Sequence, residues 1–475
     1  MSLLASEVLV VGAGPAGTLA ALRAGDLGAR TTLVTAGPFG GMAANDGPVP
    51  VRTLAHAARL MREARQLAQY GVEVGAPRLD YSRLLARVDE VVGRVGERAA
   101  LLDQIRAAGV ALHADAGAVR FLDPHTLENA DGQRFEAGKI ILCTGGVSRR
   151  LPVPGIDLTS THSDAWSLTA APQSLIVVGS GATGAQVASV FNAFGSHVEL
   201  FEAGERILRT EEPEVSACVA AAFRNAGIAI HEAFGMIEAF EAAPSGVRMI
   251  YVKDGQRRRA EAAVVVVAVG WAADTAALNL PAAGVETNDR GFIRVDAAQR
   301  TTAPHIYAAG DVVGVRMLAP QALQSGFVAA TNAVTGASER AEHLVNPIGS
   351  FTDPEYAQVG LGEDAARAAH DALVVTAGFD AVTRAIIDGR ETGLCKLVVD
   401  RADHRLLGCH LVGERAVEVA QIAAVAIAAG MRIDDLARLP ISYPTYAGVL
   451  GRAAAMAARA LNPDLAPPPF AADLR

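Results

Sequence analysis

The sequence predicts an α/β fold in three parts: two βαβ units, the second inserted into the first, and a C-terminal α+β domain. Two glycine-rich turns, Gly12–Gly17 and Gly179–Gly184, each follow an apolar strand-like run and open a helical segment. Short apolar strands then continue to alternate with helices, as in parallel α/β folds. From about Asn346 the strands alternate with period two, and no further glycine turn occurs.

The length, composition and charge favour a multidomain globular protein over a nucleic-acid-binding or membrane-spanning one. A chain of 475 residues is long enough for two to four domains, and 51% hydrophobic residues suit buried parallel sheets. The net charge of −9 and the lack of a clustered basic stretch with interleaved aromatic residues argue against nucleic-acid binding. The N-terminus runs straight into the first strand, and no apolar run reaches the roughly 18 residues that span a bilayer. We therefore expect a cytoplasmic protein with no signal peptide and no integral membrane segment.

Four cysteines occur without CxxC spacing: Cys143, Cys218, Cys395 and Cys409. We expect them to be small buried hydrophobic side chains in a reducing compartment. No cysteine or histidine spacing resembles a ligand set, so no metal site is expected.

The first part is expected to run as follows. Residues 5–35 form strand, turn, helix and strand, and a glycine-rich loop at 37–41 follows. Residues 53–70 and 80–108 are helical by period. Short strands are expected at 110–122 and then at 126–136, with a turn at Asp131-Gly132, and 140–146 adds a strand with a glycine pair.

The second part repeats the pattern over 174–203 and adds strands at 228–231, 248–253 and 263–270. Return strands are expected at 291–296 and 305–311, so the first domain is split by the second. The last part has strand patterns at 395–399 and 406–412, followed by helices. The predicted boundaries are 1–152 with 274–345, then 153–273, then 346–475.

The glycine turns predict two Rossmann-like dinucleotide-binding domains. Small residues let the backbone approach a pyrophosphate, and the helix N-terminus complements its charge. One such turn alone can be purely structural, but two copies favour two bound dinucleotides.

Glu202 ends a strand about 20 residues after the second turn, where a carboxylate binds both ribose hydroxyls and repels a 2′-phosphate. This favours NADH over NADPH, although Arg206 lies close enough to moderate the preference. The alternative is that Glu202 merely sits on the surface.

Several further motifs occur in order along the chain. They are Cys143-Thr144-Gly145-Gly146, Thr301–Asp311, Met317-Leu318-Ala319, Phe351–Glu355 and Gly360-Leu361. With the two turns they resemble the FAD-dependent pyridine nucleotide-disulfide oxidoreductases of class I, which include dihydrolipoamide dehydrogenase, glutathione reductase and mercuric reductase. The resemblance extends to near residue 460, although Pro320 replaces the family's usual histidine.

This resemblance implies FAD at the first turn, a nicotinamide nucleotide at the second turn, and a homodimer. Asp311 is expected at the ribityl–pyrophosphate region of FAD. Thr35 stands where the family usually has an acidic residue, and its hydroxyl can make only one such bond. The expected cofactor-binding residues are Gly12, Gly14, Gly17, Thr35, Gly41, Thr144, Gly145, Gly310, Asp311, Ala319, Gly179, Gly181, Gly184, Glu202 and Gly270.

The family's redox cysteine pair is replaced. Ala43 and Pro48 occupy the two cysteine positions. Disulfide exchange needs a thiolate, so the sequence predicts no reduction of lipoamide, glutathione or Hg²⁺ by that route.

The acid–base pair of the family is also replaced. Tyr443 stands for the histidine and Gly448 for the glutamate. A phenol is a poor base at neutral pH but can donate a hydrogen bond to a carbonyl or quinone oxygen. The segment around Tyr443 is similar to that of soluble pyridine nucleotide transhydrogenases. Simple packing of Tyr443 beside the flavin is the alternative.

A lysine–glutamate pair that the family places near flavin N5 corresponds to Arg52 and Gln186 here. Both changes keep or raise positive charge. Our hypothesis is that they stabilise anionic reduced flavin or attract an anionic or quinoid acceptor; neutral drift is the alternative.

Together these features predict a flavoprotein oxidoreductase that takes hydride from NADH and passes electrons directly to a quinone or other small acceptor. Arg52, Gln186 and Tyr443 are the candidate catalytic residues. The alternatives are a soluble transhydrogenase and a non-catalytic flavin-binding or sensing protein.

Overall fold

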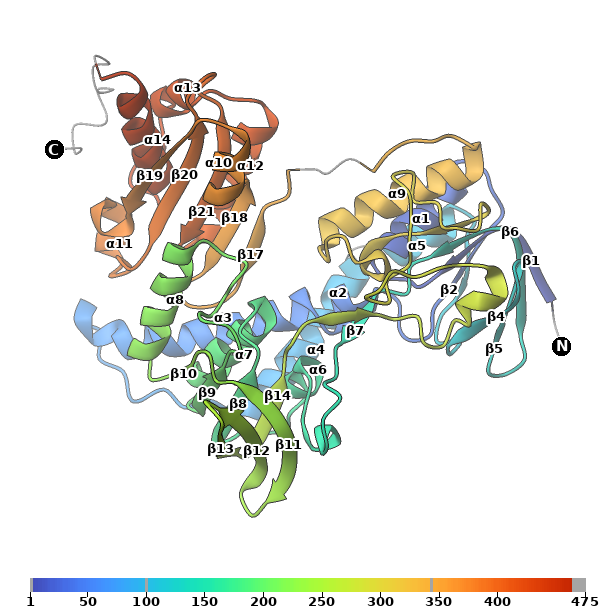
Figure 1. The fold of residues 1–475 in the computed structure, drawn as a ribbon, viewed down its shortest axis with the longest axis horizontal. Coiled ribbons are helices and arrows are strands. Elements are labelled where there is room, and N and C mark those ends of the chain that lie inside the picture. The colour runs from blue at the N-terminus through green and yellow to red at the C-terminus, as the bar shows by residue number, and fades with distance from the viewer. Residues whose placement is uncertain (1–2, 99–100, 342–344, 464–475) are drawn as a thin grey trace. The chain divides into compact units, whose positions relative to one another are not determined.

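The computed structural model describes residues 3–98, 101–341 and 345–463. The chain divides into two compact units, each made of several chain segments (Figure 1). The first unit contains Met1–Leu54, Asp80–Arg149 and Gly270–Leu344, and the second contains Ala55–Leu79, Arg150–Val269 and Val345–Arg475.

The first unit is built on a seven-stranded sheet in the order β3-β2-β1-β6-β5-β4, with β16 also paired to β6. Strands β3, β2, β1, β6 and β16 run parallel, whereas β5 and β4 form an antiparallel extension. The strands are β1 (Leu3–Val11), β2 (Thr31–Val34), β3 (Ala111–His113), β4 (Val119–Asp123), β5 (Thr126–Asn129), β6 (Arg134–Leu142) and β16 (Ile306–Ala308). A separate pair joins β7 (Gly146–Ser148) to β15 (Trp271–Ala273).

Apolar runs place the centre of this sheet in the core. Residues 8–11, 140–142 and 306–308 are buried, as expected for parallel strands covered on both faces. Helices α1 (Pro15–Asp26) and α9 (Ala319–Thr335) lie side by side on one face (Figure 1). Their close packing requires glycine at position 326, since a Cβ there would overlap the Ala16 backbone. The short helix η3 (Leu280–Ala283) joins the core on the other face.

The second unit holds three sheets. A parallel sheet has the order β10-β9-β8-β14, with α7 (Ala182–Ala193) packed on β8 and β9. A three-stranded antiparallel sheet has the order β11-β12-β13. The strands are β8 (Ser174–Val178), β9 (His197–Phe201), β10 (Ala229–His231), β11 (Met236–Ala243), β12 (Gly246–Lys253), β13 (Gln256–Ala262) and β14 (Val264–Val267).

The C-terminal part of the second unit is an antiparallel sheet in the order β17-β18-β21-β20-β19. Helix α12 (Ala416–Ala428) packs on β18 and β21, and α14 (Gly448–Leu461) packs on β19 and β20. Their alanine-rich faces fill the largest part of its apolar core. The strands are β17 (Ile348–Ser350), β18 (Tyr356–Gly360), β19 (Ala372–Gly378), β20 (Leu394–Asp400) and β21 (Leu406–Val412).

The remaining helices connect these sheets. They are α2 (Gly41–Asn45), α3 (Pro48–Gln66), α4 (Tyr81–Arg98), α5 (Leu101–Ala107), α6 (His162–Trp166), α8 (Pro213–Asn225), α10 (Glu363–Ala369), α11 (Thr383–Ile387) and α13 (Ile433–Arg438), with short 3₁₀ turns η1 (Leu67–Tyr70), η2 (Ile156–Leu158), η4 (Gly310–Val313) and η5 (Phe379–Ala381). Within the described parts of the chain, no helix is both long and apolar enough to cross a membrane.

Some predicted elements differ from the structure. The strand predicted at 110–122 is two strands, β3 and β4, because Asp115 and Gly117 take left-handed conformations between them. The strand predicted at 291–296 is wrong: Ile293 makes one isolated bridge, and the Asp296 carboxylate turns the chain by accepting from the N–H groups of Ala298 and Arg300.

Other predicted elements shift or were missed. The helix predicted at 80–108 is α4 and α5, and residues 99–100 lie outside the described residues. The turn at Asp131-Gly132 is confirmed, since Asn129 Oδ1 accepts from the N–H groups of Asp131 and Gln133. Strands β11, β13, β17, β18 and β19 were not predicted. The exact domain boundaries stay a prediction.

Candidate functional site

The first glycine turn joins β1 to α1. Gly12 has φ +102°, and a Cβ there would overlap the carbonyl oxygen of Cys143, so only glycine fits. A Cβ on Gly17 would overlap the carbonyl oxygen of Gly12. At Gly14, which caps α1, a Cβ would meet no other atom within 4 Å, and no side chain caps the helix. The open helix start therefore fits a phosphate, as the sequence predicts for a dinucleotide.

The loop after β2 packs against this turn. The Gly40 N–H donates to the Ala13 carbonyl at 3.0 Å, and a Cβ on Gly41 would lie 2.7 Å from Gly14 Cα. Gly41 therefore lies beside Gly14 in the backbone hollow at the start of α1, which we call the cradle.

Thr144 and Gly145 follow β6 at the same edge of the sheet. The Thr144 hydroxyl donates to the Asp274 carbonyl at 2.7 Å, and the Asp274 N–H donates to the Gly145 carbonyl at 3.1 Å. A Cβ on the next residue, Gly146, would lie 3.8 Å from Asp311 Cβ. The structure thus brings these predicted residues together from distant parts of the sequence.

Asp311 follows β16 in the short helix η4, and burial raises the pKa of its carboxyl group. Its neighbour Gly310 is anchored by a hydrogen bond from its N–H to Ser325 Oγ at 3.0 Å. Ala319 is the first residue of α9, and Leu318 caps that helix without a side-chain bond. Asp274 and Ser325 hold predicted site residues in place through hydrogen bonds. The sequence analysis missed both, since each bonds to a residue far along the chain and belongs to no local motif.

Thr35 is the residue immediately after β2 and is 8% exposed. Its N–H donates to the His113 carbonyl at 3.1 Å, and its carbonyl accepts from the Ala116 N–H at 3.0 Å. Thr35 therefore lies at the strand end that the sequence predicts, held by the segment after β3.

The cysteines have no disulfide partner in the structure. Cys143 is buried directly after β6, and burial raises the pKa of its thiol to about 12. Cys395 and Cys409 are buried on neighbouring strands with their Sγ atoms 3.9 Å apart. Cys218 is half-buried, so its predicted burial is only partial. Ala43 lies in α2 and Pro48 begins α3.

The second glycine turn joins β8 to α7 and repeats the first. Gly179 has φ +95°, and a Cβ on Gly184 would overlap the Gly179 carbonyl oxygen. A Cβ on Gly181 would meet no atom within 4 Å, and α7 has no side-chain cap. This helix start also fits a phosphate.

Glu202, immediately after β9, is directed at this turn. Its Oε2 accepts from the Ser180 N–H at 3.2 Å and from the Ser180 hydroxyl, and its Oε1 accepts from the Gly204 N–H at 2.7 Å. Glu202 is half-buried and takes part in these bonds, and its role in nucleotide recognition stays a prediction. Ser180 is a second residue that the sequence analysis missed, although it lies inside the motif.

Two arginines follow Glu202. The Arg206 guanidinium donates to the carbonyls of Leu208, Arg209 and Glu211 at 2.9–3.2 Å, so its donors are directed at the backbone. The exposed Arg209 side chain covers Gly204, where a Cβ would overlap Arg209 Cδ.

Gly270 lies between β14 and β15 with φ +109°, and its carbonyl accepts from the Arg149 N–H at 2.9 Å. Gly270 belongs to the first unit, whereas the second glycine turn belongs to the second unit.

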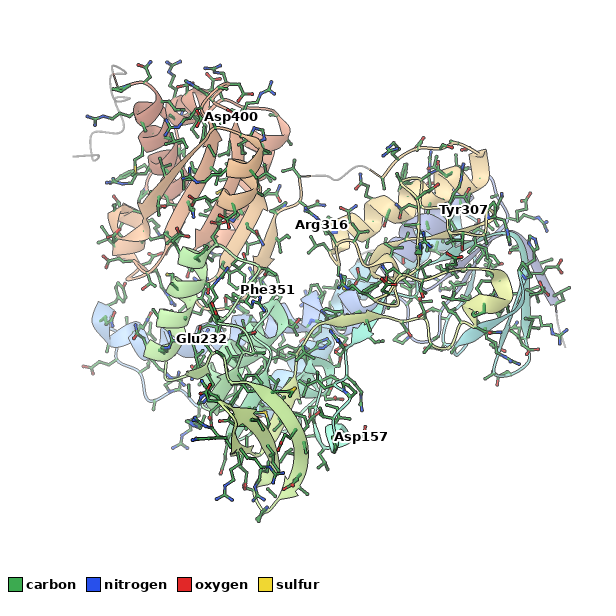
Figure 2. The ribbon with its side chains drawn as sticks, viewed as in Figure 1. Asp157, Glu232, Tyr307, Arg316, Phe351 and Asp400 are labelled. Atoms are coloured by element: carbon green, nitrogen blue, oxygen red, sulfur yellow. The ribbon has the colours of Figure 1, made fainter. Side chains whose placement is uncertain are left out.

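Arg52 and Gln186 lie in different units. Arg52 is half-buried on α3. Gln186 Oε1 accepts from the Phe351 N–H at 3.2 Å, and its Nε2 donates to the Ala182 carbonyl at 3.0 Å. Figure 2 labels Phe351 in the segment between β17 and β18. Gln186 therefore links α7 to the C-terminal part of its unit, and its role near flavin N5 stays a prediction.

Tyr443 is 74% exposed, and its hydroxyl donates to Thr383 Oγ1 at 3.1 Å. Gly448, at the position of the family's glutamate, begins α14. Tyr446 differs from Tyr443: its hydroxyl donates to Asp388 Oδ2 at 2.7 Å. Tyr443 therefore does not pack in the core of its own chain.

Across residues 3–98, 101–341 and 345–463, no group of three or more histidine, cysteine, aspartate or glutamate side chains could hold a metal ion.

Comparison with known proteins covers nearly the whole chain. Residues 6–326 match the family model of pyridine nucleotide-disulphide oxidoreductases, and residues 346–454 match the dimerisation domain of that family. A dihydrolipoyl dehydrogenase of Haloferax volcanii is 33% identical over 459 residues, which cover 94% of this chain and 95% of the relative. A mercuric reductase of Lysinibacillus sphaericus is 31% identical over 454 residues, covering 94% of this chain and 82% of the relative.

Among solved structures, the HOCl-induced flavoprotein disulfide reductase RclA from Escherichia coli has a similar fold. The TM-score is 0.83 at 24% identity, and the match covers 94% of this chain and 99% of that one. The predicted fold class is confirmed: two dinucleotide-binding folds followed by a C-terminal dimerisation domain.

Proposed function

The chain belongs to the pyridine nucleotide-disulphide oxidoreductase family and is an NAD(P)H-dependent flavoprotein oxidoreductase; within that family, we propose that it passes electrons from NADH directly to a quinone or another small acceptor. In this proposal no disulfide relays the electrons. The family implies FAD and a pyridine nucleotide as its cofactors.

The main support for this proposal is that the first unit lacks a thiol that could take part in disulfide exchange. Ala43 and Pro48 stand at the positions of the family's redox cysteines, and neither side chain can be oxidised to a disulfide. Cys143 is the only cysteine in the segments of this unit, and its raised pKa keeps it protonated behind the first turn. Since thiol exchange needs an accessible thiolate, this arrangement supports direct transfer to the second acceptor.

The first turn supplies the residues that would hold FAD. Gly14 and the start of α1 would bind the pyrophosphate, Gly41 closes the cradle, and Asp311 and Thr144 flank it. When bound there, FAD supplies the hydride-accepting redox chemistry of the reaction. The neutral Thr35 would leave recognition of its ribose to a single hydroxyl.

The NADH preference rests on Glu202. The Ser180 and Gly204 bonds hold its carboxylate beside the second turn, where it would accept from ribose hydroxyls through its remaining lone pairs. A 2′-phosphate at the same place would meet a like charge. Arg206 is directed at backbone carbonyls, which lowers its capacity to compensate.

Tyr443 is proposed to donate a hydrogen bond to the acceptor's oxygen, with its exposure in support. Arg52 and Gln186 are proposed to favour negative charge at the reduced flavin. The dimerisation domain supports a homodimer, and four unpaired cysteines suit the proposed cytoplasmic location.

One observation favours a second candidate, transhydrogenation between NADH and NADP⁺. The Arg209 side chain lies over Gly204, two residues from Glu202, and carries a guanidinium suited to a 2′-phosphate. The transhydrogenase-like segment at Tyr443 points the same way.

The deciding experiment follows flavin absorbance anaerobically after NADH is added, and then after menadione is added. Rapid bleaching and reoxidation by menadione support the proposal. Reoxidation by NADP⁺ but not menadione would favour transhydrogenation, and no bleaching by either nucleotide would indicate a sensing flavoprotein. Reduction of lipoamide or Hg²⁺ as fast as menadione would contradict the direct route.

Tyr443→Phe tests the acceptor side. Loss of one hydrogen bond to a developing charge should slow menadione reduction about fivefold to tenfold and leave bleaching by NADH unchanged. Tyr446→Phe is the matched control, since Tyr446 is bonded to Asp388 within its domain. Equal menadione rates in the wild type and Tyr443→Phe would leave Tyr443 without a role in transfer.

A further inference from the structure

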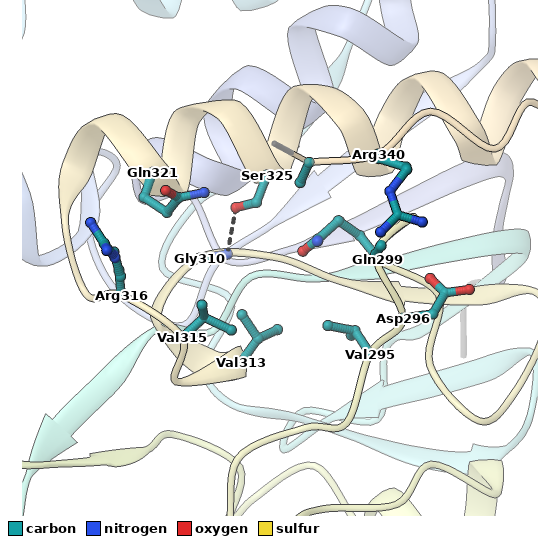
Figure 3. A pocket seen from close by; sticks show the side chains of 12 residues that line it. Val295, Asp296, Gln299, Gly310, Val313, Val315, Arg316, Gln321, Ser325 and Arg340 are labelled. Atoms are coloured by element: carbon teal, nitrogen blue, oxygen red, sulfur yellow. Dashed lines mark hydrogen bonds between the residues drawn. The ribbon is translucent and has the colours of Figure 1, made fainter. Parts of the chain in front are cut away.

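The first unit contains a groove that the proposed function does not use. Its volume is about 480 Å³, within the range of small-molecule sites. Figure 3 shows it between α9, which contributes Gln321 and Ser325, and the segments that carry Val295 and Val313. Of the predicted cofactor residues only Gly310 lines it.

Gln299 lines the groove between Gly310 and Arg340 (Figure 3). The residue is only 8% exposed, and its Oε1 is buried without a hydrogen-bond partner among the described residues. Its backbone is also left-handed, with φ +65°, and is fixed by bonds from its N–H to the Asp296 carbonyl and from the Ala308 N–H to its own carbonyl. A buried amide oxygen without a partner calls for an explanation, and left-handed residues of this kind cluster at functional sites.

Two arginines lie at opposite ends of the groove, Arg316 beside Gln321 and Arg340 beside Asp296 (Figure 3). Figure 2 also shows Arg316, on the segment between η4 and α9. No ion pair forms between either arginine and any described residue. Asp296 is the only acidic lining residue, and its Oδ1 already accepts from two backbone N–H groups. The lining therefore has a net positive charge.

Between the arginines, the groove has an apolar side formed by Val295, Val313 and Val315 (Figure 3). Arginine binds carboxylates through paired N–H donors, and valines favour a hydrocarbon body. The buried Gln299 amide, near the Arg340 end, favours a polar substituent on that body.

We propose that this groove binds a linear organic dianion, with one carboxylate on Arg316, the other on Arg340, and a hydroxyl group against Gln299. The site is separate from the proposed electron transfer, because nothing in its binding requires NADH or an acceptor.

The test is calorimetric titration of the full-length, FAD-loaded protein, without NADH, with linear dicarboxylates from succinate to suberate and their 2-hydroxy derivatives. One chain length should bind best, and its hydroxylated form should bind more tightly. Arg316→Gln and Arg340→Gln should each weaken that binding at least about tenfold, the usual effect of losing a charged hydrogen bond. Gln299→Met should remove the preference for the hydroxyl group.

Two controls make the result specific. Arg30→Gln removes an exposed arginine of the same unit, outside the groove, and should leave the affinity unchanged. The monocarboxylate of the best length should bind as weakly as the dicarboxylate binds to the arginine variants. Folding should persist in both groove arginine variants, because both side chains are exposed. No binding of any dicarboxylate at about 10 mM, or equal affinity in the wild type and both arginine variants, would overturn the proposal.

Discussion

At the first glycine turn the second strand leads into Thr35, whereas at the second turn the corresponding strand leads into Glu202. The backbones of the two turns are nearly alike: φ is +102° at Gly12 and +95° at Gly179, and the capping glycines have ψ −174° and −179°. The shared backbone fits a pyrophosphate in both places. The difference at the strand ends indicates that pyrophosphate binding and discrimination between dinucleotides depend on different positions.

The largest expected effect on cofactor binding comes from filling the two glycine turns, one at a time, with a bulky side chain. A Cβ on Gly14 or Gly181 would touch no protein atom within 4 Å, and both residues have ordinary negative φ values. Gly14→Val should therefore fold but lose most of its FAD, measured as the flavin-to-protein absorbance ratio. Gly181→Val should stay yellow but bleach with NADH at least about a hundredfold more slowly.

Thermal unfolding of both variants is the check on folding. If Gly14→Val keeps full flavin content while Gly181→Val loses it, the assignment of cofactors to the two turns is reversed.

The next effect concerns the strand end at the second turn. Glu202→Ala removes a charged hydrogen-bond acceptor and should reduce the preference for NADH over NADPH about tenfold to a hundredfold. The measurement is kcat/KM for flavin reduction by each nucleotide. Arg209→Ala is the matched comparison and should change only the NADPH value. Unchanged discrimination in Glu202→Ala would remove Glu202 from nucleotide recognition.

The smallest effect is expected at the first turn. Thr35→Val keeps the shape of the side chain and removes its hydroxyl, so FAD affinity should fall about threefold to tenfold. Equilibrium dialysis of released FAD measures this loss. A hundredfold loss would show that Thr35 is as important at its turn as the carboxylate is expected to be at the other.

The places of both turns and of Glu202 in the fold could be predicted from the sequence because each belongs to a short local pattern, and the place of Asp311 from the family resemblance. Asp274, Ser325 and the Gln186–Phe351 bond could not, because their partners lie far along the chain. Strand β13 was missed for another reason. Its residues 256–259 are exposed and include three consecutive arginines, so the apolar alternation that signals a strand is absent.

The wrong prediction of a strand at 291–296 has a third cause. Its apolar residues match a strand pattern, but the Asp296 side chain takes two backbone donors and bends the chain instead. A short side chain that competes for backbone donors can override periodicity.

The pairing of β16 with β6 has a consequence for synthesis of the chain. Ile306 pairs with Ile140, so the first sheet receives its last strand only after the whole second dinucleotide fold has been translated. At about 5–20 residues per second, a ribosome leaves the Ile140–Leu142 edge unpaired for on the order of ten seconds or more. An apolar strand edge of this kind is prone to pair with other chains. Nascent or truncated chains that end before Ile306 are therefore the species that we expect chaperones to bind.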